Sequence, residues 1–329
     1  NYTKARFGSD EKLYLAGDNG FGENGFVQRV DPATGDVLWT VNSDLWLSDM
    51  QVDGLGNIFV IGRIARDSFR RFGQHQFSSH PETTNYVARI SSVGGVSSAV
   101  RMPVVGTAVI RGVLPLPEGG IVVSRGHGNI HRLERFAEDG TLQTERDAVA
   151  SGQLAHAPNG DLLVAGSYTH ALNWGASSDL QVPARENGGL FVGRLQDDGT
   201  PIWLRVNTAT EGGSLQVHNR ILDKNLQVAD NGDIIVAGIM LDAGSLNLGG
   251  ETLPRFGIAD AFLASFSPDG THRWSTSFGS NANTSTLDVF SSLHIGSDNR
   301  LRALLVHSQS LVTELGTLAV GENILEFQM

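Results

Sequence analysis

One short pattern recurs six times along the 329 residues, and it constrains the fold more than any other feature. In each copy an apolar stretch leads into a turn rich in Gly, Asn or Asp, and a second apolar stretch follows. Apolar segments around such a turn are typical of a tight β-hairpin. The copies begin at Ala5, Met50, Val113, Leu154, Leu226 and Leu293.

A second hairpin pattern follows each of the first five copies. It consists of a strand, an Asp-Gly or Gly-Gly type turn and another strand, and its copies begin at Phe26, Tyr86, Arg132, Phe191 and Phe262. Two successive hairpins make a four-stranded antiparallel sheet, and six such sheets in series are typical of a β-propeller. No long segment has a helical period, so the pattern predicts an all-β fold. The alternative, a pair of β-sandwiches, would not require the same hairpin six times.

The repeats predict a single β-propeller domain that covers residues 1–329. The expected repeat units are approximately 1–47, 48–110, 111–150, 151–222, 223–290 and 291–329. In the last unit the 329-residue sequence ends at Met329 without a segment that matches a fourth strand. We therefore expect six blades with an incomplete last one, or seven blades if the natural chain continues.

Composition excludes several classes of function. There is no cysteine, which removes disulfides, thiol catalysis and cysteine-ligated metals. The 24 Lys and Arg against 35 Asp and Glu give a net charge of −11, and this argues against a nucleic-acid partner. No apolar run reaches the roughly 18 residues of a membrane span. The 40 glycines fit a chain with many turns.

The segment LNLGGETLPRFGIADAFLASFSPDGTHRWSTSFG, residues 246–279, resembles the bacterial β-propeller repeats known as SBBP-like. Separately, VDPATGDVLWTV at residues 30–41 is similar to the Thr-Gly-x-x-x-Trp segment of pyrroloquinoline-quinone-type (PQQ-like) propeller repeats. The first resemblance implies a secreted or surface protein of bacterial type, located outside the cell, on its surface or in the periplasm. Neither resemblance implies an activity, because both families include many non-enzymes.

Two residue types recur at equivalent positions. Tryptophan stands four residues after a turn glycine, where its ring would fill the wedge between neighbouring sheets, at Trp39, Trp203 and Trp274. Arginine stands near the end of the third strand, at Arg29, Arg89, Arg135 and Arg194. A half-buried guanidinium needs a partner, so we expect these arginines to bind turn carboxylates within or between blades.

Neither a cofactor nor a metal site is expected. A formal G-x-G-x-x-G at residues 20–25 is followed by a strand rather than by the helix that phosphate binding requires. The ten histidines show no ligand spacing on one element. Weak calcium binding at the oxygen-rich turn Asp230 to Asp233 is the one alternative that stays open.

The long insertions all fall in the connections between the second and third strands or between successive repeats. These connections lie at one end of every sheet, here called the loop end, and variable loops on a rigid scaffold are where recognition concentrates. Three apolar residues stand at equivalent positions in these insertions and are expected to pin their loops to the sheets: Phe72, Trp174 and Leu248. The candidate contact residues are Arg70, Arg71, His75, His80, Tyr168, His170, Arg185 and Glu186.

The first strand of each repeat is expected to lie nearest the propeller axis and carries alternate polar residues. They would line a wet central channel, and they are Lys4, Arg6, Asp49, Gln51, Gln153, Asn225, Gln227, Ser292 and His294. The set contains no evident acid–base pair or nucleophile constellation.

The leading functional hypothesis is a non-enzymatic, secreted or cell-surface scaffold that binds a protein or glycan partner through its loop end. One alternative is a propeller enzyme that acts on polysaccharide or uses a quinone, although a quinone would need an aromatic floor that the sequence does not indicate. Another alternative is a structural module of a surface fibre or larger assembly.

Overall fold

In the computed structural model the chain forms two compact units, Asn1–Asp147 and Ala148–Met329. The described residues form strands and turns without an α-helix, and none of their segments is a helix long and apolar enough to cross a membrane. The structure describes residues 2–8, 10–17, 25–102, 109–117, 119–127, 130–148, 152–168, 171–174, 180–184, 189–206, 226–241, 246–257, 259–279, 288–296, 300–307, 311–313, 316–318 and 321–328.

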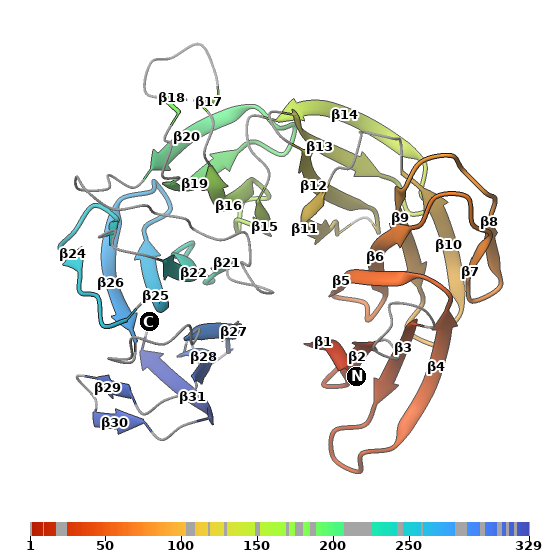
Figure 1. The fold of residues 1–329 in the computed structure, drawn as a ribbon, viewed down its shortest axis with the longest axis horizontal. Helices are drawn as coiled ribbons and strands as arrows, with labels where there is room; N and C mark the ends of the chain where they lie inside the picture. Colours follow the sequence, from red (N-terminus) through yellow and green to blue (C-terminus); the bar gives the residue numbers. More distant parts are fainter. Residues whose placement is uncertain are drawn as a thin grey trace. The chain divides into compact units, whose positions relative to one another are not determined.

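The first unit contains three antiparallel sheets that follow one another in chain order (Figure 1). The first comprises β1 (Tyr2–Phe7), β2 (Leu13–Gly17), β3 (Gly25–Val30) and β4 (Val37–Ser43), and the short strands β7 (Arg70–Phe72) and β8 (His75–Phe77) continue it beyond β4. The second comprises β5 (Trp46–Val52), β6 (Ile58–Ile64), β9 (Thr84–Ile90) and β10 (Val96–Arg101). The third comprises β11 (Val109–Pro115), β12 (Ile121–His127), β13 (Ile130–Phe136) and β14 (Leu142–Ala148).

The second unit repeats this arrangement. Its first sheet comprises β15 (Gln153–His156), β16 (Leu162–Tyr168), β19 (Gly189–Leu195) and β20 (Pro201–Val206). Its second comprises β21 (Leu226–Val228), β22 (Ile234–Leu241), β25 (Ala259–Phe266) and β26 (His272–Phe278). Its third has three strands among the residues described, β27 (Val289–Ile295), β28 (Arg300–His307) and β31 (Gly321–Gln328).

Small hairpins occupy the insertions after the second strand of four sheets. They are β7 (Arg70–Phe72) with β8 (His75–Phe77), β17 (Leu172–Asn173) with β18 (Gln181–Val182), β23 (Leu246–Asn247) with β24 (Thr252–Leu253), and β29 (Leu311–Thr313) with β30 (Gly316–Leu318).

The sheet turns share one backbone geometry. At Ser91 the N–H donates to the carbonyl of Gly95 and the carbonyl accepts from Gly94, at 2.8 and 2.9 Å. Nine turns among the described residues have this pair of bonds. In eight of them the fourth residue is a glycine with φ between 78° and 94°, and in the ninth it is Glu11 with φ 59°. A type I turn followed by a left-handed residue is a common hairpin loop, and only glycine adopts that conformation without strain. The recurring turn glycines of the sequence are therefore a backbone requirement.

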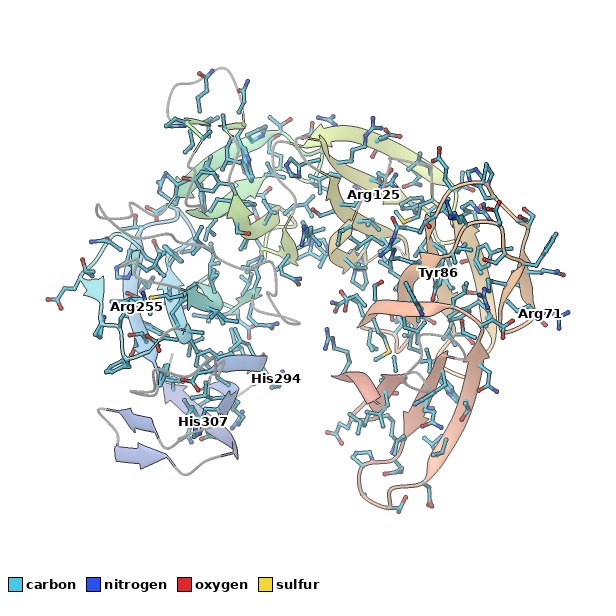
Figure 2. All side chains as sticks on the ribbon, in the orientation of Figure 1. Arg71, Tyr86, Arg125, Arg255, His294 and His307 are labelled. Carbon is cyan, nitrogen blue, oxygen red and sulfur yellow. The ribbon has the colours of Figure 1, made fainter. Side chains whose placement is uncertain are left out.

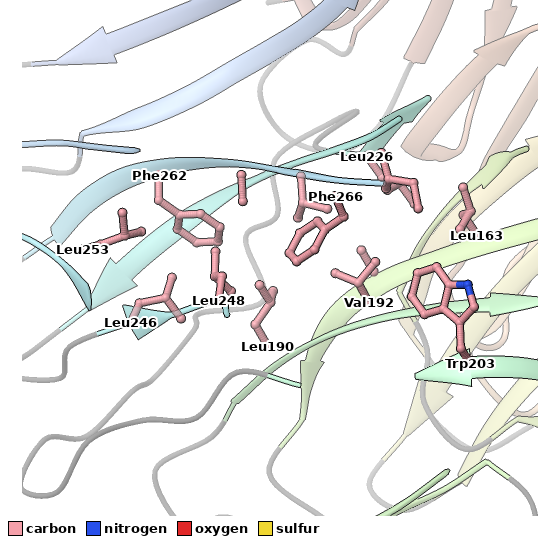
Figure 3. Packing of buried hydrophobic residues seen from close by; sticks show 14 of the residues in the cluster. Leu163, Leu190, Val192, Trp203, Leu226, Leu246, Leu248, Leu253, Phe262 and Phe266 are labelled. Carbon is pink, nitrogen blue, oxygen red and sulfur yellow. The ribbon is translucent and has the colours of Figure 1, made fainter. Parts of the chain in front are cut away.

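The core lies between successive sheets of each unit. In the second unit, Val192 and Trp203 of its first sheet face Phe262 and Phe266 of its second sheet (Figure 3). Comparable clusters join the other neighbouring sheets, for example Val60 with Val27 in the first unit. Burial of these apolar faces is the main stabilising contribution to the sheet stacking.

The repeated tryptophans join neighbouring sheets through the turns. Trp39 Nε1 donates to the carbonyl of Ser92 at 3.1 Å, and Trp203 Nε1 donates to the carbonyl of Pro268 at 3.2 Å. In both cases the ring lies against the turn glycine of the next sheet, because a Cβ at Gly94 or Gly270 would meet the ring at 2.9 or 3.0 Å. The expected wedge role is thus observed, with a hydrogen bond in addition.

The repeated arginines bind turn carboxylates as predicted. Arg29 pairs with Asp10 at 2.7 Å and Arg194 pairs with Asp161 at 2.8 Å, each within its own sheet. Arg194 also donates to the carbonyl of Pro268 in the next sheet at 2.9 Å. These arginines therefore serve the packing of the sheets.

Candidate binding surface at the loop end of the second sheet

The β7–β8 hairpin, inserted between β6 and β9, lies across the outer strands of two sheets. Ser43 at the end of β4 pairs with Phe72, and Gly73 N–H donates to the carbonyl of Asn42 at 2.9 Å. On the other side the His75 Nε2 atom lies 3.2 Å from the carbonyl oxygen of Val96 in β10. The insertion therefore covers the outer edge of β4 near its end and connects the first two sheets.

The apolar residues of this hairpin point into the molecule. Phe72 and Phe77 are buried, and their ring centroids lie 5.7 and 5.6 Å from that of Tyr86. Trp174 and Leu248 are buried in the corresponding insertions of the second unit. All three insertions are therefore pinned by an apolar side chain, as their sequences indicated.

The predicted contact residues differ in their surroundings. Arg71 is exposed on β7 and points away from the sheet (Figure 2), whereas Arg70 is half-buried. His75 is held by its contact with the Val96 carbonyl, and half-buried His80 accepts a hydrogen bond from Glu82 N–H at 3.1 Å. Arg71 is thus the candidate that is most available to a partner.

The other predicted contact residues come from the insertion of the second unit's first sheet. Tyr168 is only 5% exposed, because it is the last residue of β16 and pairs with Gly189 inside the sheet. This differs from the expectation of an exposed contact residue. His170, Arg185 and Glu186 lie outside the described residues.

Trp46 and Arg63 form a surface that sequence reasoning missed. Trp46, the first residue of β5, is 47% exposed and pairs with Arg63 at the end of β6. The Arg63 guanidinium lies 6.0 Å from the centroid of the Trp46 ring, within the range of a cation–π contact. The expected first repeat unit, residues 1–47, includes Trp46 at its end, and the signal in the sequence is a tryptophan outside the recurring tryptophan position.

Arg66 and Phe69 extend this surface toward Arg71. Both lie in the connection between β6 and β7, and Phe69 is 68% exposed. Arg71 is joined to the start of β5 through its backbone, since its carbonyl accepts from Asp44 N–H at 2.9 Å. We refer to Trp46, Arg63, Arg66, Phe69 and Arg71 as the Trp46 surface.

The first strands of the first unit bring part of the predicted channel set together. Buried Arg6 of β1 donates to Asp49 of β5, with Nη2 and Oδ1 3.3 Å apart. Asp49 also accepts from its neighbour Gln51, at 3.4 Å. Arg111 on β11, the next first strand, was not predicted, and burial lowers the pKa of its guanidinium.

The other described channel candidates lie on the first strands of the second unit, where β15 contacts β21 and β21 contacts β27, or at the start of the chain. Gln153 and Gln227 are half-buried on β15 and β21, and His294 is exposed on β27 (Figure 2). Lys4 and Ser292 belong to β1 and β27, but their side chains lie outside the described part of the chain, as does all of Asn225. That these residues line one channel stays a prediction.

The candidate calcium turn is occupied by protein groups. The Asp233 carboxylate lies 2.9 Å from Arg273 Nη2 and accepts from the Asn231 side chain at 3.0 Å. The same side-chain bond joins Asn159 to Asp161 in the preceding sheet. Across the described ranges no group of three or more His, Asp or Glu is arranged to hold a metal ion.

Comparisons with known proteins identify the fold and leave the family open. No protein-family model matches the chain, and no curated protein matches it. Among solved structures it is similar to hydrazine synthase from Kuenenia stuttgartiensis, with a TM-score of 0.56 and 11% identity over 93% of this chain and 76% of that one. It is also similar to an inactive virginiamycin B lyase from Staphylococcus aureus, with a TM-score of 0.49 and 11% identity over 99% and 84% of the two chains.

The chain has an all-β, propeller-type fold. The first of these similarities covers nearly the whole chain, and each unit contains successive antiparallel sheets of the size of a propeller blade. At 11% identity the likeness concerns the fold alone, so function has to be argued from the chain's own residues.

Proposed function

We propose that this chain is a non-enzymatic β-propeller scaffold of a secreted or cell-surface bacterial protein, related to the SBBP-like repeats, and that it binds a protein or glycan partner through its loop end. The resemblance of residues 246–279 to those repeats supports the location and the family. The Trp46 surface supports the binding role.

The observation that carries the proposal is the exposure of Trp46. Trp39 and Trp203 occupy the recurring position and donate their indole N–H groups to turn carbonyls, so packing accounts for them. Trp46 lies outside that position, is 47% exposed and has Arg63 beside its ring. Aromatic and arginine side chains are enriched at binding hot spots.

A catalytic role has less support from the described residues. His272 Nε2 lies 3.1 Å from Ser275 Oγ, which is the spacing of a nucleophile and its base. Across the described part of the chain, however, His272 donates no hydrogen bond to a carboxylate, and such a bond would orient the ring. Both residues lie on β26 of the second unit.

The experiment is a binding screen of the purified chain on protein and glycan arrays. We expect a partner whose signal falls about tenfold or more in the variant W46A/R71A. The matched control is L55A/V93A, which removes the exposed apolar side chains of the β5–β6 and β9–β10 turns of the same sheet, 73% and 80% exposed, and should bind like the wild type. Circular dichroism of all three proteins establishes that they are folded.

Equal loss in the control variant, or unchanged binding by W46A/R71A, would contradict the proposed use of the loop end.

A further inference from the structure

Positive charge is concentrated at the Trp46 surface of an otherwise acidic chain. Residues 63–71 contain four arginines and one acidic residue, whereas the whole chain has a net charge of −11. Three of these arginines, Arg63, Arg66 and Arg71, are exposed. A local excess of one sign attracts ligands of the opposite sign and accelerates their association.

These three arginines also differ from most others in the structure by lacking an ionic partner. Among the described residues no carboxylate lies within 4.0 Å of Arg63, Arg66 or Arg71, although Asp44 and Asp67 are close in sequence. The arginines that do pair with carboxylates are Arg6, Arg29, Arg89, Arg125, Arg132, Arg194, Arg255, Arg273, Arg300 and Arg302. The guanidinium groups of the Trp46 surface are therefore available to an external anion.

The edge of β4 beside the surface is not free for an added peptide strand. The end of β4 is already paired, because Ser43 bonds to Phe72 and Asn42 accepts from Gly73. The apolar side chains that a peptide pocket would need, Phe72 and Phe77, are buried beneath the β7–β8 hairpin. What remains exposed is the ring of Trp46 with the Arg63 guanidinium beside it, together with Arg66 and Arg71 in the segment that follows β6.

We propose that the Trp46 surface binds an acidic polysaccharide, with carboxylate or sulfate groups on its sugars. The exposed indole gives a flat apolar platform for the face of a sugar ring. The guanidinium groups of Arg63 and Arg71 provide planar donor pairs that match the oxygen geometry of carboxylates and sulfates. This assignment rests on the proposed function, and it names the class of ligand for the same surface.

The test is calorimetric titration of the intact chain with four probes of matched length: a polygalacturonate oligomer, a heparin oligosaccharide, poly-glutamate and a neutral dextran oligomer. We expect one or both acidic oligosaccharides to bind, and their affinity to fall as NaCl is raised. W46A and R63A/R71A should each weaken binding about tenfold or more. The charge-matched control R146A/R300A removes two exposed arginines elsewhere and should change affinity less than about twofold.

The other outcomes separate this inference from the proposed function. Loss of affinity in R63A/R71A without any loss in W46A would show simple ion exchange and overturn the inference. Tight binding of poly-glutamate with the same variant dependence would make the partner an acidic peptide, which overturns the glycan assignment but leaves the proposed binding role. If neither acidic oligosaccharide binds but an array partner still depends on Trp46, the glycan assignment is likewise overturned and the proposed binding role stands.

Discussion

Arg125 donates a hydrogen bond to Glu134, and the two side chains are 1% and 0% exposed inside the third sheet of the first unit (Figure 2). Strand pairing shows that Arg125 occupies the position of Gly62 and Gly238 in other sheets. At those glycines an aromatic ring lies on the backbone, since a Cβ at Gly62 would meet Tyr86 at 2.6 Å. The third sheet replaces this apolar arrangement with an ion pair.

The reason lies in the missing insertion. Glu134 occupies the position of Gly193, where the inserted Trp174 packs so closely that a Cβ would lie 2.3 Å from its ring. In the third sheet β12 and β13 pair as far as His127 and Ile130, which leaves no insertion to supply such a side chain. We interpret the Arg125–Glu134 pair as the group that fills this space.

Breaking the buried pair should cost far more than replacing it. Arg125→Met leaves the Glu134 carboxylate buried without its partner, and we expect a loss of about 3–5 kcal/mol in the free energy of unfolding. The double variant R125M/E134L substitutes apolar groups of similar volume and should lie within about 1 kcal/mol of the wild type. Urea unfolding measures both. Equal losses in the two variants would mean that the pair does not act as a unit.

Tyr14 should make the first unit sensitive to alkali. Its buried hydroxyl donates to Asp10 at 2.8 Å, and burial together with this bond raises the pKa of the phenol to about 12, against 10.0 for the free group. Above pH 10 the unfolded chain therefore loses a proton that the folded chain keeps. This stabilising contribution is complete below pH 10 and is lost as the pH rises through about 12.

Tyr14→Phe should accordingly show a shallower decline of stability between pH 10 and 12 than the wild type. The ultraviolet titration of tyrosinate, taken as the difference between the two proteins, should have its midpoint near 12. A midpoint near 10 would show that the hydroxyl is not held as described.

The tryptophan contacts with the turns predict a graded series. Trp203→Phe and Trp39→Phe each remove a hydrogen bond to a turn carbonyl, and each should cost about 1 kcal/mol beyond the change in ring size. Trp274→Phe is the control, because its ring stacks on Phe327 at 6.1 Å and no indole N–H bond is recorded for it among the described residues. A thermal unfolding series in which Trp274→Phe loses as much as the other two would argue against the turn bonds.

Two turn glycines separate backbone strain from packing. Gly160 has φ +90° and open space around it, so Gly160→Ala should cost about 1–2 kcal/mol for the left-handed backbone alone. Gly270 has φ +81°, and a Cβ there would also meet the Trp203 ring at 3.0 Å. Gly270→Ala should therefore be clearly more destabilising in chemical denaturation, and equal effects would mean that the ring moves aside freely.

Local and repeated features of the fold could be predicted from the sequence. The turn glycines identified the hairpins, because the left-handed position of each turn admits glycine almost exclusively. Arg29 and Arg194 could be placed beside turn carboxylates, because equivalent positions in repeated sheets meet equivalent neighbours.

Features that belong to one repeat escaped prediction. The pairing of Phe72 with Ser43 joins segments of different sheets, and no local pattern specifies it. The exposure of Trp46 depends on β5 beginning two residues earlier than the expected repeat boundary at residue 48. Arg125 did leave a signal, a charged residue where other repeats have glycine, but its partner Glu134 became evident only from the strand register.

The central claim is that the loop end of the second sheet receives the partner, and hydroxyl-radical footprinting with mass spectrometry tests it most directly. Trp46 and Phe69 are exposed at the loop end, while Leu55 and Val93 are exposed in the β5–β6 and β9–β10 turns, so one experiment reports on both ends of the sheet. With a saturating acidic oligosaccharide, oxidation of Trp46 and Phe69 should fall while that of Leu55 and Val93 stays unchanged. Unprotected Trp46, or protection centred on Leu55 and Val93, would contradict the account.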